Sequence, residues 1–351
     1  MPHADTGMRL SVLDLIPVRT GQSSADAVAA SLSLARLADD LGCTRYWYAE
    51  HHNMPAVAST TPPVLIAATA MATKRMRVGS GGVMLPNHAH FVVAEQFAAL
   101  EAIAPGRIDL GIGRAPGSDP VITQVLRAGG VRGDVDRFGD DVADILSLMR
   151  PGGATLRLTS ERTYPIAATP AATTVPTVWL LGSSDYSARL AAQLGLPYVF
   201  ANHFSGDGLE QALALYRGEY QPSEDHPEPI TILTLNAVVA DTRDEAFALA
   251  LPQLRSMARL RANRGLIAAE TIEEAANATA DPVIDELTQT IASPWVIDDA
   301  DTAATRVQAF ADRYDIDEVM VSPVAGASAS DPLDRTPARE RTLELLAARL
   351  L

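Results

Sequence analysis

Short apolar runs alternate with helix-forming stretches along almost the whole chain of 351 residues. The helical stretches carry apolar residues at helical spacing, as Leu34, Leu37, Ala38 and Leu41 do. We predict eight strands, over residues 8–16, 46–49, 77–85, 107–113, 177–182, 198–202, 230–240 and 317–322. Eight strands separated by helices predict an α/β protein built as a closed (β/α)8 TIM barrel, and a doubly wound parallel sheet is the alternative.

Two connections are longer than such a barrel needs. Residues 150–176, after the fourth predicted strand, contain TLRL and RTYPI, which could pair as a small hairpin outside the barrel. Residues 242–305 follow the seventh strand, and the insertion itself covers about 255–305. Connections of this length tend to be lids or mobile loops. We therefore expect a single domain over 1–351, with insertions after strands four and seven.

Charge and cysteine content narrow the possible partners. The formal net charge of −15 argues against nucleic acid or an anionic membrane surface as the main partner. The single cysteine, Cys43, excludes a disulfide framework and a Cys-built zinc site, and we expect a buried, inert thiol. We find neither a secretory signal nor an apolar stretch long enough to span a membrane, so a cytoplasmic protein is expected.

Polar residues gather just after the predicted strands. Glu50, His51 and His52 follow the second strand, and His88 and His90 come shortly after the third. In a TIM barrel these strand ends surround one mouth, where active sites are built. Within the third strand, the pair of glycines at 81–82 suggests that a flat cofactor approaches the backbone closely, with a bulge as the alternative.

The fifth strand runs through Gly182, Ser183 and Ser184 into a helix, and Ser187 lies one turn further on. A helix N-terminus favours an anion, and Arg114 leaves the neighbouring fourth strand. These groups together predict a phosphate site, while an ordinary serine N-cap and a surface ion pair of the arginine are the alternatives. The segment GIGRAPG at 111–117 does not fit a dinucleotide fingerprint, because its third glycine comes too late.

Histidine suits proton transfer near neutral pH, and we expect one of the pair at 51–52 to face the cavity while the other is structural. A metal site is the alternative, but no carboxylate marks the end of the eighth strand, and we predict no metal. Its candidate ligands are His51, His52, His88, His90 and His203. We expect an apolar mouth around Trp47, Tyr48, Met84, Phe200 and Phe204, although several of these must face the core.

Four ordered segments, 41–53, 77–96, 106–119 and 178–197, resemble the bacterial luciferase-like flavin monooxygenase family. The family has the TIM-barrel fold and binds FMN. The resemblance implies that His51 is the active-site histidine and that Gly81 and Gly82 face the flavin ring, often across a non-proline cis bond. It also implies that Arg114 binds the flavin phosphate. The backbone of Ser183 and the hydroxyls of Ser184 and Ser187 complete that site.

The resemblance implies an FMN-dependent monooxygenase that acts on an unidentified small organic substrate. Reduced FMN, supplied by a separate flavin reductase, reacts with O₂ in this family to give a flavin hydroperoxide. A homodimer is expected by the same resemblance. A deazaflavin-dependent oxidoreductase of the same fold and a non-catalytic flavin-binding protein are the alternatives. Gly113 replaces the thiol that true luciferase carries beside the phosphate arginine, so light emission is not implied.

Overall fold

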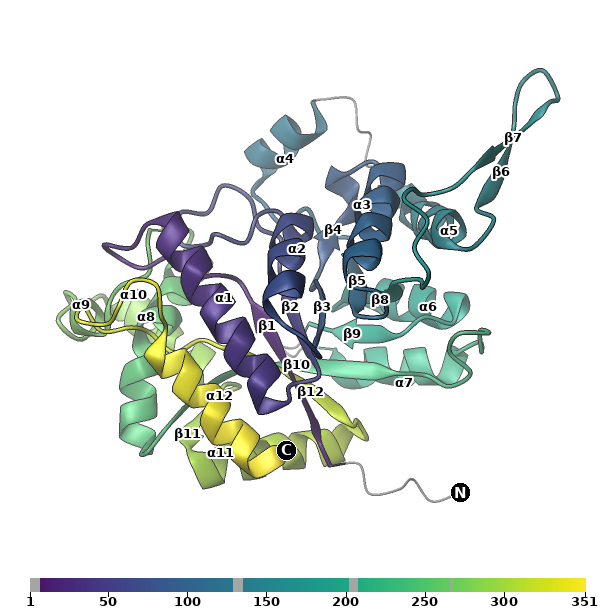
Figure 1. The fold of residues 1–351 in the computed structure, drawn as a ribbon. Coiled ribbons are helices and arrows are strands. Elements are labelled where there is room, and N and C mark those ends of the chain that lie inside the picture. Colours follow the sequence, from purple (N-terminus) through teal and green to yellow (C-terminus); the bar gives the residue numbers. More distant parts are fainter. Residues whose placement is uncertain (1–6, 129–134, 202–207, 266) are drawn as a thin grey trace.

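The computed structural model describes residues 7–128, 135–201, 208–265 and 267–351. Its parallel strands close into an eight-stranded ring, which confirms the predicted TIM barrel (Figure 1). In ring order the strands are β1 (Arg9–Asp14), β2 (Arg45–Tyr48), β3 (Arg77–Ser80) continued by β4 (Val83–Met84), β5 (Ile108–Gly113), β8 (Thr177–Gly182), β9 (Tyr198–Phe200), β10 (Thr231–Ala240) and β12 (Glu318–Pro323). The pairings β9–β10 and β12–β1 close the ring, so the doubly wound sheet is excluded.

Helices follow the strands and cover the outside of the barrel (Figure 1). They are α1 (Ser24–Leu41), α2 (Pro62–Ala72), α3 (His90–Ile103), α5 (Phe138–Met149), α6 (Asp185–Leu194), α7 (Leu209–Glu219), α8 (Arg243–Arg261), α11 (Ala300–Tyr314) and α12 (Pro337–Leu350). A further helix, α4 (Pro120–Arg127), follows β5 and stands apart from this layer (Figure 1). Local sequence sets their ends where signals are strong. Ser23 and Asp26 form a capping box before α1, and Gly42 ends that helix with φ 89°.

The third predicted strand, 77–85, is divided in two. β3 ends at Ser80 and β4 begins at Val83, and the peptide bond between Gly81 and Gly82 is cis, as the resemblance implies. A Cβ atom on Gly82 would lie 2.8 Å from the carbonyl oxygen of Gly111 on β5. Glycine at 82 is therefore required by the close packing of neighbouring strands, whatever binds at the open side.

The structure of the first insertion agrees with the prediction from the sequence, and that of the second does not. β6 (Ala154–Arg157) and β7 (Thr163–Ile166) pair antiparallel and extend away from the barrel, which confirms the hairpin (Figure 1). After strand seven the expected lid or loop is wrong: the described part of 242–305 forms α8, α9 (Ile272–Ala276), α10 (Pro282–Ala292), β11 (Val296–Asp299) and the start of α11. Thr271 and Asp281 cap the two short helices, and β11 pairs with the end of β10 outside the ring.

The N-terminal end of the barrel is closed by a buried ion network. Arg45 donates through Nε to Glu318 at 2.6 Å and through Nη1 to Asp109 at 2.8 Å. The guanidinium also lies 4.7 Å from the ring centroid of Trp179, inside the barrel. Apolar side chains, including Trp47, Trp179 and Ile232, fill the middle of the barrel. The C-terminal end is thus where a ligand can enter.

Two further expectations concern the chain as a whole. Cys43 is free and buried, and burial raises the pKa of its thiol to about 12, so the expected inert thiol is confirmed. None of the described helices combines the length and the apolar character that a membrane span requires.

Candidate functional site

A cavity of about 450 Å³ opens at the C-terminal end of the barrel. It brings together all the residues that the sequence singles out for the site: His51, Gly81, Gly82, Arg114, Ser183, Ser184 and Ser187. They come from the ends of four different strands, which meet here because the sheet is parallel and closed. The volume lies within the range of ordinary small-molecule sites.

Arg114 and the first turn of α6 lie side by side. Gly113 at the end of β5 is paired in register with Leu181 of β8. Arg114, which follows β5, and Ser183, which follows β8, therefore belong to the same wall of the cavity. The Arg114 guanidinium stacks 4.2 Å from the ring centroid of Tyr186, a residue that we did not predict to be part of the site. Within the described ranges no carboxylate forms an ion pair with this guanidinium, so the surface ion-pair alternative finds no support.

The serine side chains at this wall do not cap α6. Ser184 occupies the N-cap position of α6, yet its side chain makes no capping hydrogen bond, so the ordinary N-cap interpretation is wrong. Ser187 is only 3% exposed, and its side chain fills the space beside Gly182. A Cβ atom on Gly182 would collide with the Ser187 hydroxyl. Glycine at the end of β8 therefore lets this hydroxyl turn toward the cavity wall.

His51 lines the opposite side of the cavity, just beyond β2. Its backbone N–H donates to the carbonyl of Ser59 at 3.0 Å, which fixes the chain at this point. The ring Nδ1 is buried and has no hydrogen-bond partner among the described residues. Burial lowers the pKa of His51 below its ordinary 6.5, so the ring is neutral at pH 7 with one nitrogen free to accept a proton.

Glu50 anchors the segment that carries His51. Its buried Oε1 accepts hydrogen bonds from Nε2 of His52 at 2.8 Å and of His88 at 2.7 Å, and Oε2 accepts from the backbone of Met84 at 3.1 Å. Burial alone would raise the pKa of Glu50, but the bonds from the two histidines lower it to about 2. His52 is thus structural, as expected for one of the pair, and the sequence assigned Glu50 no role.

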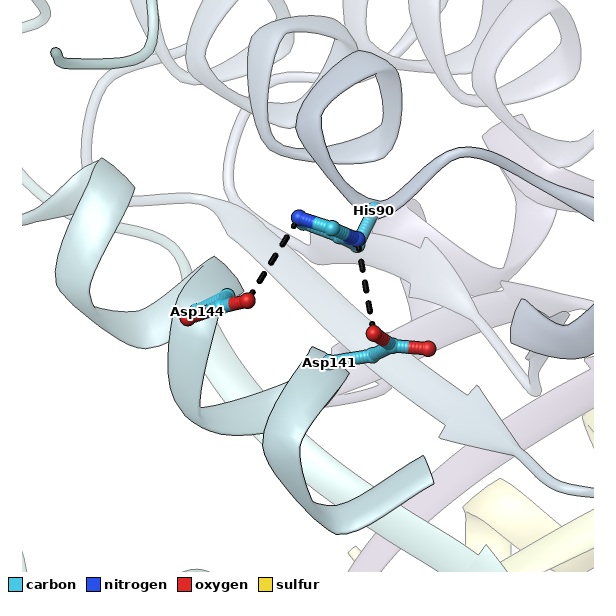
Figure 2. Close-up of side chains that lie close together, drawn as sticks. All are labelled: His90, Asp141 and Asp144. Carbon is cyan, nitrogen blue, oxygen red and sulfur yellow. Dashed lines mark ion pairs between the residues drawn. The ribbon is translucent and has the colours of Figure 1, made fainter. Parts of the chain in front are cut away.

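The histidines in the described part of the chain do not converge on one site. His52 and His88 share the Glu50 carboxylate, and His203 lies outside the described residues. His90, at the start of α3, faces Asp141 and Asp144 of α5, each at 3.5 Å (Figure 2). None of those three residues lines the cavity. The arrangement therefore gives the five-histidine metal site no support.

The remaining walls of the cavity are largely apolar. Trp47 and Met84 line it as expected, together with leucines at 13, 15 and 181, Val199 and Met320. Tyr48 and Phe200 do not; both are buried in the layer between strands and helices, where the Tyr48 hydroxyl bonds to Thr69 at 2.7 Å. Their side chains point outward because neighbours along a strand alternate in direction. Phe204 lies outside the described residues.

The fold and this site define a class of protein, and comparisons identify it. The family model for luciferase-like monooxygenases matches residues 8–315. The chain belongs to the luciferase-like monooxygenase family. A luciferase-like monooxygenase of Escherichia coli K12 is 45% identical over 257 residues, which are 73% of this chain and 74% of the relative.

Solved structures show the same fold over nearly the full length. Apo-MsnO8 has a TM-score of 0.84 at 30% identity, covering 98% of this chain and 99% of that one. The oxygenating constituent of 3,6-diketocamphane monooxygenase from Pseudomonas putida, solved in complex with FMN, has a TM-score of 0.70 at 19% identity, covering 98% of each chain. This second likeness shows the barrel fold.

Proposed function

We propose that the chain is an FMN-dependent monooxygenase that uses reduced FMN and O₂ to oxidise a small organic molecule. The observation that carries the proposal is the pairing of Arg114 with the hydroxyls of Ser184 and Ser187 at one wall of an apolar cavity, with His51 at the other. Family membership supports a monooxygenase, and a barrel of the same fold was solved with FMN bound.

The residues present fit this cofactor. A phosphate dianion needs positive charge and hydrogen-bond donors. The wall offers the Arg114 guanidinium, which has no carboxylate partner among the described residues, and the Ser184 hydroxyl, which makes no capping hydrogen bond. It also offers the N-terminus of α6. A flat ring needs an apolar slot, which the leucines, Trp47 and Met84 provide. We propose that Gly81 and Gly82 face that ring.

When bound in its reduced form, the flavin supplies the reaction with O₂. The protein's own residues bind, orient and exclude water. Arg114, Ser184 and Ser187 fix the phosphate end, and the apolar walls keep the reacting end dry. His51 lines the cavity and is neutral, so its imidazole ring can accept a proton from the reacting group and return it.

Titration with FMN and with riboflavin tests the phosphate site directly, because riboflavin is the same ring system without phosphate. Arg114→Ala removes a charged hydrogen bond of about 1.5–3 kcal/mol, so FMN affinity should fall by about 10- to 150-fold. Riboflavin affinity should stay within about twofold. Arg162→Ala, in the exposed β6–β7 hairpin, is the matched control and should bind both ligands like the wild type.

Equal losses for FMN and riboflavin would mean that Arg114 supports the cavity in general and does not bind phosphate. Unchanged FMN affinity would refute the assignment outright.

A separate reductase is part of the proposal, because the chain carries no dinucleotide fingerprint through which a nicotinamide could reduce the flavin. Chemically reduced FMN should therefore support O₂ uptake that depends on a substrate, without NADH or NADPH. Substrate turnover with a reduced deazaflavin coenzyme under anaerobic conditions would replace the monooxygenase by a hydride-transfer enzyme. Flavin binding without either reaction would indicate a non-catalytic protein.

We also propose a homodimer, formed through α2 and α3. α2 contains no charged residue, yet Val64 and Met71 are 66% and 75% exposed on it. The adjacent α3 exposes Phe91, Val92 and Ile103. A patch of this kind marks an interaction surface. Light scattering should report a dimer that Met71→Lys converts to monomer, and a monomeric wild type would refute the proposal.

A further inference from the structure

A second, smaller chamber of about 90 Å³ lies at the same end of the barrel, and its lining includes residues of β10, β12 and the segment after β1. Side chains two residues apart along a strand face the same side. On β10, Thr234 lines the cavity and Asn236 lines the chamber. On β12, Met320 lines the cavity and Ser322 lines the chamber. Leu15 lines both. The chamber therefore continues the cavity toward the mouth of the barrel.

The chamber lies across the barrel from the proposed phosphate site. Arg114 and the serines follow β5 and β8, whereas β12 and β1 lie three or four strands further round the ring, on its opposite side. A cofactor anchored at β5 and β8 would extend from that wall into the cavity. A molecule held in the chamber would reach the same cavity from the other side, past Leu15.

A buried positive charge faces this chamber. Arg19 is only 7% exposed and lines the chamber, and its Nη1 and Nη2 donate to the backbone carbonyls of Ser328 at 3.0 Å and Asp331 at 2.6 Å. Its Nε is buried and has no hydrogen-bond partner among the described residues. Nor does any carboxylate in the described ranges form an ion pair with it. A buried guanidinium in this state favours an anionic ligand.

A second unpartnered group lines the same chamber. Thr336 precedes α12 at the N-cap position, but its hydroxyl makes no capping bond and is buried without a partner in the described structure. The N-terminus of a helix adds to the positive potential. The other lining charges are balanced, since Arg339 pairs with Asp14 at 2.7 Å and Glu270 with Arg255 at 2.8 Å.

We propose that this chamber binds the carboxylate of the organic substrate, with Arg19 Nε and the Thr336 hydroxyl as its donors. The apolar side chains of Met257, Trp295 and Leu15 would contact the carbon chain that leads from the carboxylate to the cavity. The substrate class is thus a small organic acid with an apolar chain. That the bound acid is the substrate rests on the proposed function; that the chamber selects an anion does not.

Calorimetric titration of the flavin-free protein with hexanoate and with hexanamide tests the chamber, because the two probes differ in charge at one end. Hexanoate should bind at least tenfold more tightly than the amide. Thr336→Val should weaken hexanoate binding about tenfold, and Thr336→Ser, which keeps the hydroxyl, should restore it. Since this hydroxyl bonds nothing in the described structure, Thr336→Val should fold normally.

Arg19→Met should abolish the preference for hexanoate, and Arg157→Met, in the exposed hairpin, controls for the loss of one positive charge. Equal affinity for the two probes, no binding of hexanoate, or an unchanged Thr336→Val variant would overturn the proposal. Hexanoate that competes with FMN would do the same, because it would place both anions in one site. Selective hexanoate binding without any FMN binding would support the anion site while refuting the proposed function.

Discussion

Replacing Glu50 by glutamine tests how the segment that carries His51 is held. The carboxylate accepts bonds from two histidines and one backbone N–H, and these lower its pKa to about 2 from an ordinary 4.5. At about 1.4 kcal/mol for each pH unit, the folded state favours the charged form by about 3 kcal/mol. A glutamine side chain has only one carbonyl oxygen that can accept these hydrogen bonds. Its NH₂ group is itself a donor and cannot accept a bond from the histidines or from the Met84 N–H. We expect Glu50→Gln to lower the free energy of unfolding by about 3 kcal/mol at pH 7.

The stabilisation that the Glu50 carboxylate contributes to the folded state depends on pH. A carboxyl whose pKa is lowered by folding contributes its stabilisation fully above pH 4.5 and loses it as the pH falls toward 2. Urea unfolding from pH 7 to pH 3 should therefore show wild type and Glu50→Gln converging below pH 4.5. Glu228→Gln, at an exposed loop position, is the control and should match the wild type throughout. A difference below about 0.5 kcal/mol, or one independent of pH, would refute the role given to this carboxylate.

Three further changes probe other parts of the structure. Arg45→Met should lower the free energy of unfolding by about 3–5 kcal/mol in urea, because it leaves Asp109 and Glu318 buried without this partner; a loss under 1 kcal/mol would contradict that. His51→Ala should leave FMN affinity within about twofold while turnover falls about 100-fold or more, and wild-type turnover should decline only below pH 6.5, since burial lowers the pKa of that histidine. Gly182→Ala should weaken FMN but not riboflavin, about tenfold, by displacing the nearby serine hydroxyl; equal effects on both ligands would contradict this.

The barrel could be predicted because each strand is a separate apolar run with clear ends. The bounds of β8, Thr177–Gly182, were predicted to the residue, and the wall that joins Arg114 to Ser184 followed from the rule that adjacent strands end at one mouth. Predictions made from one segment and its immediate neighbour thus held well.

What the sequence did not reveal depends on contacts between distant segments. Arg19 reaches carbonyls more than 300 positions further along the chain, and nothing near residue 19 indicates that its Nε lacks a partner. The stacking of Tyr186 on Arg114 likewise needs two strands to be placed side by side. β11 was missed because it is four residues long, has only two apolar residues, Val296 and Ile297, and runs directly into α11.

A crystal structure of the protein with FMN would show whether Arg114 and the start of α6 hold the flavin phosphate. We predict that the phosphate oxygens lie within hydrogen-bond distance of the Arg114 guanidinium and of the hydroxyls of Ser184 and Ser187, with the ring in the apolar cavity. A phosphate bound instead after β10 and β12, beside Thr336 at the start of α12, would contradict it.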